Sequence, residues 1–490
     1  MAATPPREAR RPGLRLMAGV TAVGLLAGCS SVSSGVNSVL GLGGSTGPTQ
    51  GQAGFVRGFL GQVVTDEPRA AVVAREILSA GGSAQDAAVA ASFTLAVTLP
   101  SRAGLGGGGA CLVYDQRRRE AEAVIFPAGA RTDVAPGADR PAAIPMYARG
   151  LFAVHVRGGR LPFEQLIAPA EQSARFGTEV SRALAADLAV AGTPLVADPW
   201  SRQSFGTPDG RPLAEGARMQ QPDLASTLAA LRTAGVGDMY QGGLARRIED
   251  VSPVAGAGLT AAEMRAGLPR IVPSLDTPGI ASGDRIHWLP TDGGLAAAAT
   301  FRALQGGATP QAAAETGLRA ARALRIGGGD PAAILASTPA GDGAFPSLPA
   351  STSLVVMDRE GGAVACAFSL NNLFGTGRVA QGLGFLFGAA PGIGSIEPPL
   401  LPAAIVTSST LRAFRAAAAG SGQFAAPLAV AGPLREALRG VSVPDAVANG
   451  VSDPGRASLA GCSRYLPGAP ETCRAASDPR GFGVALGTLE

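Results

Sequence analysis

The stretch that decides the fold is ASTSLVVMDREGGAVACAFSLNNLFGTG, which runs from Ala350 to Gly377. It opens with hydroxyl side chains and continues as an apolar, β-branched run, Leu354 to Met357. A polar, Gly-containing turn follows at Asp358 to Gly362, and a second apolar run extends from Ala363 to Phe368. Two apolar runs of this length on either side of a short turn predict a β-hairpin.

The hydroxyls at the start of this hairpin have two interpretations. In one, the Ser and Thr residues are ordinary polar groups at the end of a strand. In the other, the chain cuts itself and the new terminal residue becomes a nucleophile, with its own α-amine (pKa ~8) as the base. A Gly- and Pro-rich loop predicted at residues 327–349 would let the cut ends separate. Taken alone, these residues favour the ordinary hairpin.

Composition describes a globular protein. Hydrophobic residues make up 46% of the 490 residues and charged residues 16%, so the chain can bury one large core or two to three smaller ones. The net charge is only +4, and no basic cluster is interleaved with aromatic residues, which argues against nucleic-acid binding. No metal site or cofactor is expected, because the chain has no C-x-x-C pair and the predicted chemistry needs only hydroxyl, amine and backbone N–H groups.

The chain has two histidines, His155 and His287, and both are expected to be packed structural residues. A Ser-His-Asp triad would need one of them, and no G-x-S-x-G segment supplies its nucleophile.

The N-terminus is typical of an export signal. Four arginines precede an apolar stretch from Leu16 to Ala27 that is too short to span a bilayer. The stretch ends in Leu-Ala-Gly-Cys29, which resembles the bacterial lipoprotein box; the alternative is a plain secretory signal. We therefore expect a signal peptide at 1–28, lipidation of Cys29, a Ser/Gly-rich tether at 29–54, and a periplasmic protein anchored to a bacterial membrane. The sequence does not distinguish between an inner-membrane and an outer-membrane anchor.

The periplasm is oxidising, so the remaining cysteines can form disulfides there. Cys462 and Cys473 bracket a Gly/Pro-containing loop and are predicted to form a disulfide, with two unpaired thiols as the alternative. Cys111 and Cys366 lie in apolar runs and are predicted to be core residues.

Further along the chain, helices are predicted at Ala70 to Leu78 and from a Ser83–Asp86 capping pair to about Val97. A glycine run, Gly104 to Gly109, precedes a strand at Ala110 to Tyr114. No Lys follows the run, so a Walker phosphate loop is excluded, and close backbone packing is the better interpretation.

Six segments together resemble the γ-glutamyltransferase (glutathione hydrolase) family. They occur in the family's order over roughly residues 60–490: ILSAGGSAQDAAVAA (77–91), GLGGGG (104–109), GRLPFEQLIAPA (159–170), QPDLASTL (221–228), GDMYQGGLA (237–245) and DPRGFG (478–483).

The resemblance implies an α+β fold, the four-layered αββα sandwich of N-terminal-nucleophile hydrolases. It implies self-cleavage between Ala350 and Ser351 into a large subunit (55–350) and a small one (351–490) that stay together as a heterodimer. Ser351 would be the catalytic nucleophile, or Thr352 if the register slips by one. Ser369 would support it, a role that the family gives to Thr.

The polar Asn of the family maps onto Asn371. The family's oxyanion turn maps onto Gly420, Ser421 and Gly422, where the match is loose. The alternatives are strand-end polar groups and an ordinary tight turn.

The family's glutamate-binding residues are replaced. Pro127 stands where an Arg binds the substrate α-carboxylate, and Arg131 is the substitute that lies nearest in the sequence. Residues 388–391 (GAAP) lack the Asp that binds the α-ammonium, and Leu401-Pro402 replaces a Ser pair. We expect these losses to share one pocket.

Three functions remain open at this stage: a hydrolase of γ-glutamyl or related amides, a self-cleaving hydrolase of another small peptide or acyl amide, and an uncleaved, non-catalytic lipoprotein.

Overall fold

The computed structural model describes residues 1–2, 58–131, 134, 136–337, 339–450 and 453–487. The chain divides into two units, Met1–Thr49 and Gln50–Glu490. The expected signal peptide, Cys29 and the tether lie outside the described residues. None of the helices in the described part of the chain combines the length and the hydropathy of a transmembrane span.

Two antiparallel sheets form the centre of the larger unit. The seven-stranded sheet contains, in spatial order, β15 (Val484–Leu486), β1 (Gly61–Thr65), β9 (Thr352–Asp358), β10 (Ala363–Ser369), β2 (Gly108–Asp115), β3 (Glu120–Phe126) and β6 (Arg270–Pro273). The six-stranded sheet contains β14 (Cys473–Ser477), β13 (Arg456–Leu466), β12 (Ala413–Ser421), β11 (Ala403–Ser408), β8 (Asp284–Trp288) and β7 (Leu275–Pro278). A separate two-stranded ribbon pairs β4 (Thr178–Glu179) with β5 (Arg218–Met219).

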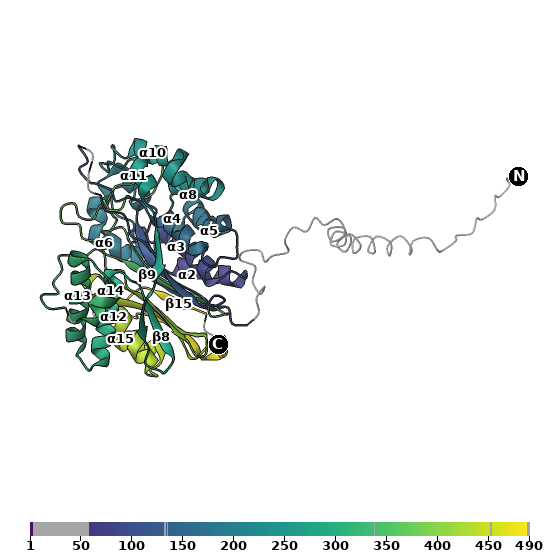
Figure 1. The fold of residues 1–490 in the computed structure, drawn as a ribbon. Helices are drawn as coiled ribbons and strands as arrows, with labels where there is room; N and C mark the ends of the chain where they lie inside the picture. Colours follow the sequence, from purple (N-terminus) through teal and green to yellow (C-terminus); the bar gives the residue numbers. More distant parts are fainter. Residues whose placement is uncertain (3–57, 132–133, 135, 338, 451–452, 488–490) are drawn as a thin grey trace. The chain divides into compact units, whose positions relative to one another are not determined.

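Helices cover the outer face of each sheet (Figure 1). The first group is α2 (Pro68–Ser79), α3 (Ala84–Thr98), α4 (Tyr147–His155), α5 (Phe163–Phe176), α6 (Arg182–Val196), α7 (Pro199–Phe205), α8 (Pro222–Ala234), α9 (Asp238–Gln241), α10 (Gly243–Val251) and α11 (Ala261–Ala266). The second group is α12 (Asp292–Gln305), α13 (Pro310–Gly327), α14 (Pro331–Ala336), α15 (Ala426–Leu438) and α16 (Val443–Asn449). Short 3₁₀ turns lie at Gln423–Ala425 and Pro470–Thr472.

The apolar side chains form three main cores that match this layering. One core lies between the first helix group and the seven-stranded sheet, and another lies between the six-stranded sheet and the second group. The third is made of the inward-facing residues of both sheets, including Val355 of β9 and Ala417 of β12. Because successive strand residues face opposite sides, β9 contributes Leu354 and Val356 to the helix side and Val355 and Met357 to the centre. The arrangement is an α+β, four-layered αββα sandwich, as expected.

The predicted hairpin is confirmed: β9 and β10 pair antiparallel, with Thr352 opposite Phe368. The capping pair is confirmed too, since the Ser83 hydroxyl accepts from the Asp86 N–H and the Asp86 side chain accepts from the Ser83 N–H. The prediction of one loop over residues 327–349 is wrong. It contains α14, which begins after Asp330 because that side chain accepts a hydrogen bond from the Ala332 N–H at the helix start.

The glycine run brings strands close together beside the start of β9. A Cβ on Gly108 would lie 2.2 Å from the Phe126 carbonyl oxygen, and one on Gly107 would lie 2.6 Å from the Ser369 carbonyl oxygen. Only glycine permits this approach, so the run is structural and sets the spacing of the strand ends.

Candidate active site

Ser351 immediately precedes β9 and is buried at 2% exposure. Residue parity along β9 directs Ser351 to the same inner face as Ser353, whose hydroxyl lies 3.1 Å from the Ser458 hydroxyl on the opposite sheet. Within the described residues, the Ser351 hydroxyl has no hydrogen-bond partner. Because a buried hydroxyl without a partner is unfavourable, such a group is a candidate for chemistry.

The peptide bond before Ser351 is contacted by the next strand. The Ser369 hydroxyl, at the end of β10, donates a 2.7 Å hydrogen bond to the Ala350 carbonyl oxygen. The same Ser369 oxygen accepts a 3.0 Å bond from the Asn371 N–H. The Asn371 side-chain amide donates to the carbonyl oxygens of Ala128 and Ala389, at 3.3 and 3.0 Å. Thus Ser369 contacts the bond that would be cut, whereas Asn371 ties neighbouring loops together.

Thr352 faces the helix side, away from Ser351. Its hydroxyl donates a 2.8 Å hydrogen bond to Asp66, which also accepts from the Ser353 N–H at 3.1 Å. Burial raises the pKa of Asp66, although the nearby charge of Arg102 and these two hydrogen bonds act in the opposite direction. The Thr352 hydroxyl is therefore already engaged, in contrast to that of Ser351.

An ion pair between the half-buried Arg102 and the buried Asp187 lies on this side of the strand. Arg102 donates to both carboxylate oxygens of Asp187, at 2.8 and 2.6 Å, and its Nη1 lies 3.5 Å from the Ser351 carbonyl oxygen. We did not anticipate Asp66, Arg102 or Asp187 from the sequence. The one available signal was the T-D-E-P segment at 65–68, which is typical of a helix start.

The predicted oxyanion turn approaches from the six-stranded sheet. Ser421 is 1% exposed, and its hydroxyl, like that of Ser351, has no partner in the described part of the chain. Gly422 has φ +111°, and a Cβ there would lie 2.3 Å from the Pro454 carbonyl oxygen, so glycine is required. Gln423 also has a positive φ, +57°, and its side-chain amide donates a 2.7 Å bond to the Leu348 carbonyl oxygen. This contact joins the turn to the segment just before Ser351.

The positions of the lost glutamate clamp line two adjacent clefts rather than the single pocket that we expected. Pro127 and Leu401 line a cleft of about 500 Å³, whereas Ala389 and Ala390 line a different one of about 390 Å³. The two clefts are neighbours, because the Asn371 amide nitrogen donates to the carbonyl oxygens of both Ala128 and Ala389.

Arg131 does not replace the missing arginine. Its buried guanidinium donates to the Glu263 carboxylate at 2.7 Å and to the carbonyl oxygens of Ala257 and Gly258 at 2.9 and 2.6 Å. All three nitrogens are thus committed to the protein, and Arg131 serves the structure of its own loop.

Two disulfides are present among the described residues. Cys462 and Cys473 face each other on β13 and β14 and are joined. Cys111 and Cys366 lie in the core, as predicted, but they are also joined across β2 and β10, where they stand directly opposite each other. This bond could not be predicted from local sequence patterns, because the two residues are 255 positions apart.

Both histidines have structural partners. His155 Nε2 lies 2.9 Å from the Leu161 carbonyl oxygen. His287 lies between Asp276, 2.8 Å from Nδ1, and Thr407, 2.9 Å from Nε2. Neither histidine contacts Ser351 through a hydrogen bond in the described residues.

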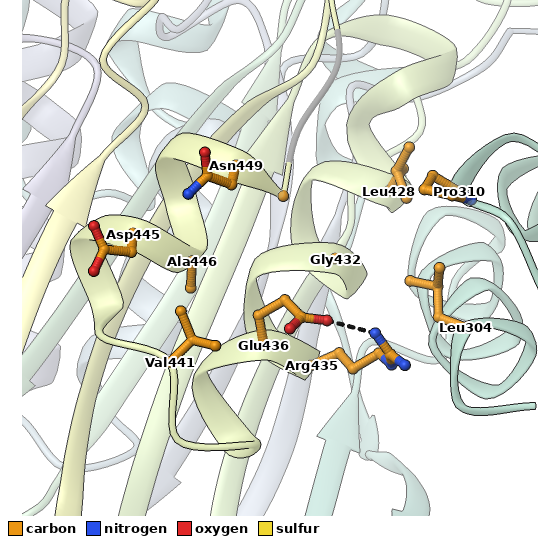
Figure 2. A pocket seen from close by; sticks show the side chains of 11 residues that line it. Leu304, Pro310, Leu428, Gly432, Arg435, Glu436, Val441, Asp445, Ala446 and Asn449 are labelled. Carbon is orange, nitrogen blue, oxygen red and sulfur yellow. Dashed lines mark hydrogen bonds and ion pairs between the residues drawn. The ribbon is translucent and has the colours of Figure 1, made fainter. Parts of the chain in front are cut away.

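A separate cavity of about 480 Å³ lies in the outer helical layer, among residues of α12, α13, α15 and α16 (Figure 2). Apolar side chains such as Leu304 and Leu428 line it beside an ion pair between Arg435 and Glu436. It contains none of the site residues predicted from the sequence. The described residues also contain no cluster of three or more His, Cys, Asp or Glu side chains that could hold a metal ion.

Sequence comparisons agree with this arrangement. The model of the gamma-glutamyltranspeptidase family matches residues 70–326, a little over half of the chain. Human glutathione hydrolase 7 is 38% identical over 197 residues, which cover 37% of this chain and 29% of the human protein. The glutathione hydrolase proenzyme of Bacillus subtilis is 30% identical over 217 residues, 41% of this chain and 37% of that protein. The chain therefore matches well under half of the length of these curated relatives.

Among solved structures, cephalosporin acylase from Bacillus halodurans has a TM-score of 0.68 at 18% sequence identity. The superposition covers 91% of this chain and 99% of the acylase. At this identity the likeness concerns the fold alone, and it extends over both sheets.

Proposed function

Because the chain belongs to the gamma-glutamyltranspeptidase family, with the N-terminal-nucleophile hydrolase fold, we propose that it cuts itself before Ser351 and then hydrolyses γ-glutamyl or related amides. The observation that carries the proposal is the pairing of an unpartnered Ser351 hydroxyl with a preceding carbonyl that accepts a hydrogen bond from Ser369. Thr352 is the weaker choice because its hydroxyl binds Asp66.

Self-cleavage proceeds by an acyl shift. The Ser351 oxygen attacks the Ala350 carbonyl carbon, the C–N bond breaks, and the hydroxyl proton passes to the freed α-amine. The ester that results is hydrolysed by water, which leaves a carboxyl group on Ala350 and a free N-terminus on Ser351. Negative charge develops on the Ala350 oxygen during the attack, and the Ser369 hydroxyl is placed to stabilise it.

The mature site then repeats the chemistry on a substrate. The Ser351 hydroxyl attacks the substrate amide carbonyl, its α-amine removes the proton, and the leaving amine departs with that proton. Water, deprotonated by the same amine, releases the acid from the acyl-enzyme; an acceptor amine in place of water would give transfer. We assign the stabilisation of the negative charge on the attacked carbonyl oxygen to the unpartnered Ser421 hydroxyl and to the backbone N–H groups of its turn, at the end of β12 on the opposite sheet.

Covalent trapping tests the proposal. The purified protein is mixed with an amide substrate, quenched in acid, and every chain, cut or uncut, is weighed by mass spectrometry. We expect an acyl adduct on the 351–490 fragment of the native protein and of Ser351→Thr, and none on the uncut chain of Ser351→Ala. Ser353→Ala is the matched control, because its hydroxyl lies on the same face but pairs with Ser458. An adduct that persists in Ser351→Ala would refute the assignment.

We also propose that Cys29 anchors the protein in the periplasm and that the cut products, 55–350 and 351–490, form the two subunits. Metabolic labelling with palmitate tests the first point. Label in the native protein and none in Cys29→Ser is the expected result, and equal label in both would exclude this anchor.

A further inference from the structure

The cleft that contains Pro127 and Leu401 has mostly apolar walls. Its volume is about 500 Å³, within the usual range for a small-molecule site. Ile125, Val272 and Leu324 line it, together with several prolines besides Pro127. A wall of this kind favours an apolar occupant, because each buried methylene gains free energy on leaving water.

The charged residues of the wall are Arg270, Asp292 and Arg325, and they leave no free carboxylate for a substrate ammonium group. Asp292 is the one acidic residue in the lining. Its Oδ2 accepts two hydrogen bonds from Arg325, at 2.8 and 2.6 Å, and its Oδ1 accepts from the Gly293 N–H at 2.7 Å. Arg325 in turn also pairs with Glu397 at 3.2 Å. A glutamyl group carries an α-ammonium, which would enter this cleft without a partner.

The strand register relates the cleft to Ser351, because Pro127 lies at the same level of the seven-stranded sheet as Ser351, three strands away. Ser369 stands beside Ser351 on the next strand and opposite Gly108 on β2, and Gly108 packs against the backbone at Pro127. Three strand spacings of ~4.8 Å put Pro127 about 14 Å from Ser351. On the opposite sheet, the pairing of Ala403 with Ala419 continues toward Leu401 and Ser421.

We propose that this cleft binds the acyl group of the substrate, and that the preferred group is a linear apolar acyl chain without an α-ammonium. The inference rests on the proposed function and specifies its substrate class. Pro127 lies between Ser351 and Val272 in this register, and its side chain is short, so a long acyl chain can pass it toward Ile125 and Val272. The amide C–N bond breaks, the acyl carbon bonds to the Ser351 oxygen, and the amine leaves with the hydroxyl proton.

A substrate series tests the inference on the purified full chain, after intact mass has established the fraction that is cut. The probes are p-nitroanilides of γ-glutamate and of butyric, hexanoic, octanoic and decanoic acids. We expect kcat/KM to rise about fourfold for each methylene that enters the cleft, so the rise should begin with the longer acyl chains and stop when the cleft is full. The hexanoyl compound should exceed the γ-glutamyl compound at least about tenfold, because an unpaired charge would be buried with the latter.

Two neighbouring residues of β6 provide matched variants. Val272 lines the cleft and Ile271 points to the other side of the same strand, 37% exposed. Val272→Asn should flatten the dependence on chain length, whereas Ile271→Asn should leave it as in the native protein. Pro127→Arg should lower the octanoyl rate while sparing the butyryl rate, because a long side chain would block the cleft between Ser351 and Val272, a part that a butyryl chain does not reach.

The outcomes separate the two proposals. An uncut chain overturns the proposed function, and this inference falls with it. A cut chain that prefers the γ-glutamyl compound, shows no dependence on acyl length, or turns over none of the probes overturns the inference and leaves self-cleavage intact.

Discussion

The Ser369 hydroxyl donates a 2.7 Å hydrogen bond to the carbonyl oxygen of Ala350. That carbonyl precedes a buried serine whose own hydroxyl has no partner among the described residues. The same two strands therefore present the bond to be cut, the group that attacks it and a donor for the developing charge.

Loss of the Ser369 hydroxyl should slow maturation. The hydrogen bond is worth about 1–1.5 kcal/mol, so Ser369→Ala should cut about five- to thirteenfold more slowly than the native chain. Ser369→Thr keeps the hydroxyl and should retain most of the rate. The measurement is the uncut fraction against time on a reducing gel. Equal rates in the native chain and in Ser369→Ala would show that this contact does not assist the cut.

The disulfide between Cys111 and Cys366 should hold the cut products together covalently. The two cysteines lie on opposite sides of the Ala350–Ser351 bond, so cleavage cannot separate the fragments while the disulfide is intact. We expect one band on a denaturing gel without reductant and two bands with it. Cys366→Ala should give two bands in both conditions. Two bands from the oxidised native protein would contradict the pairing.

Arg131 should matter for stability rather than for substrate binding. Arg131→Ala leaves Glu263 and several carbonyl oxygens without their donor, which should lower the free energy of unfolding by about 3 kcal/mol or more. Arg140→Ala is the control, since that exposed side chain makes one hydrogen bond, to the Thr376 carbonyl oxygen. Thermal unfolding measures both. Unchanged stability combined with a higher KM for substrate would instead place Arg131 in the binding site.

Asp66 should make stability depend on pH in a direction unusual for a carboxylate. Burial raises its pKa above the ordinary 3.8, so the folded chain binds more protons than the unfolded one between 3.8 and the raised value. Stability linked to this group is therefore greatest at low pH and declines as pH rises through that window. Asp66→Asn keeps an acceptor for Thr352 and should gain stability relative to the native chain as pH increases from 4 to 8.

Asp276 provides a control of opposite sign. Burial would raise its pKa, but the hydrogen bond and charge of His287 lower it overall. Its contribution is present above the ordinary pKa and is lost as pH falls. Asp276→Asn should therefore lose stability near neutral pH and approach the native chain in acid. Parallel curves for the two variants would contradict both assignments.

Local patterns predicted the elements that surround the site. The β9–β10 hairpin and the helix cap at Ser83 were both predicted from short-range sequence patterns, and both are present in the structure. The glycine run was interpreted correctly as close packing, because a Cβ at Gly107 or Gly108 would meet neighbouring backbone.

What the sequence could not supply depends on pairings between distant segments. The disulfide of Cys111 with Cys366 joins strands 255 residues apart, and the Asp66–Thr352 bond joins the end of β1 to the start of β9, 286 residues further along the chain. The hydrogen bond between Arg131 and Glu263 could not be predicted from the sequence either. Arg131 lies close to Pro127 in the sequence, but this bond keeps it from taking the role of the missing arginine. The prediction of a single loop before Ser351 was wrong because Asp330 caps a short helix, α14, within that segment.

The most direct test of the account is the intact mass of the purified protein under reducing conditions, beside Ser351→Ala and Thr352→Val. We predict two fragments from the native chain and from Thr352→Val, with the second fragment beginning at residue 351, and one uncut chain from Ser351→Ala. A native protein that stays whole after long incubation, or a fragment that begins at Thr352, would contradict the assignment of Ser351 as a self-made nucleophile.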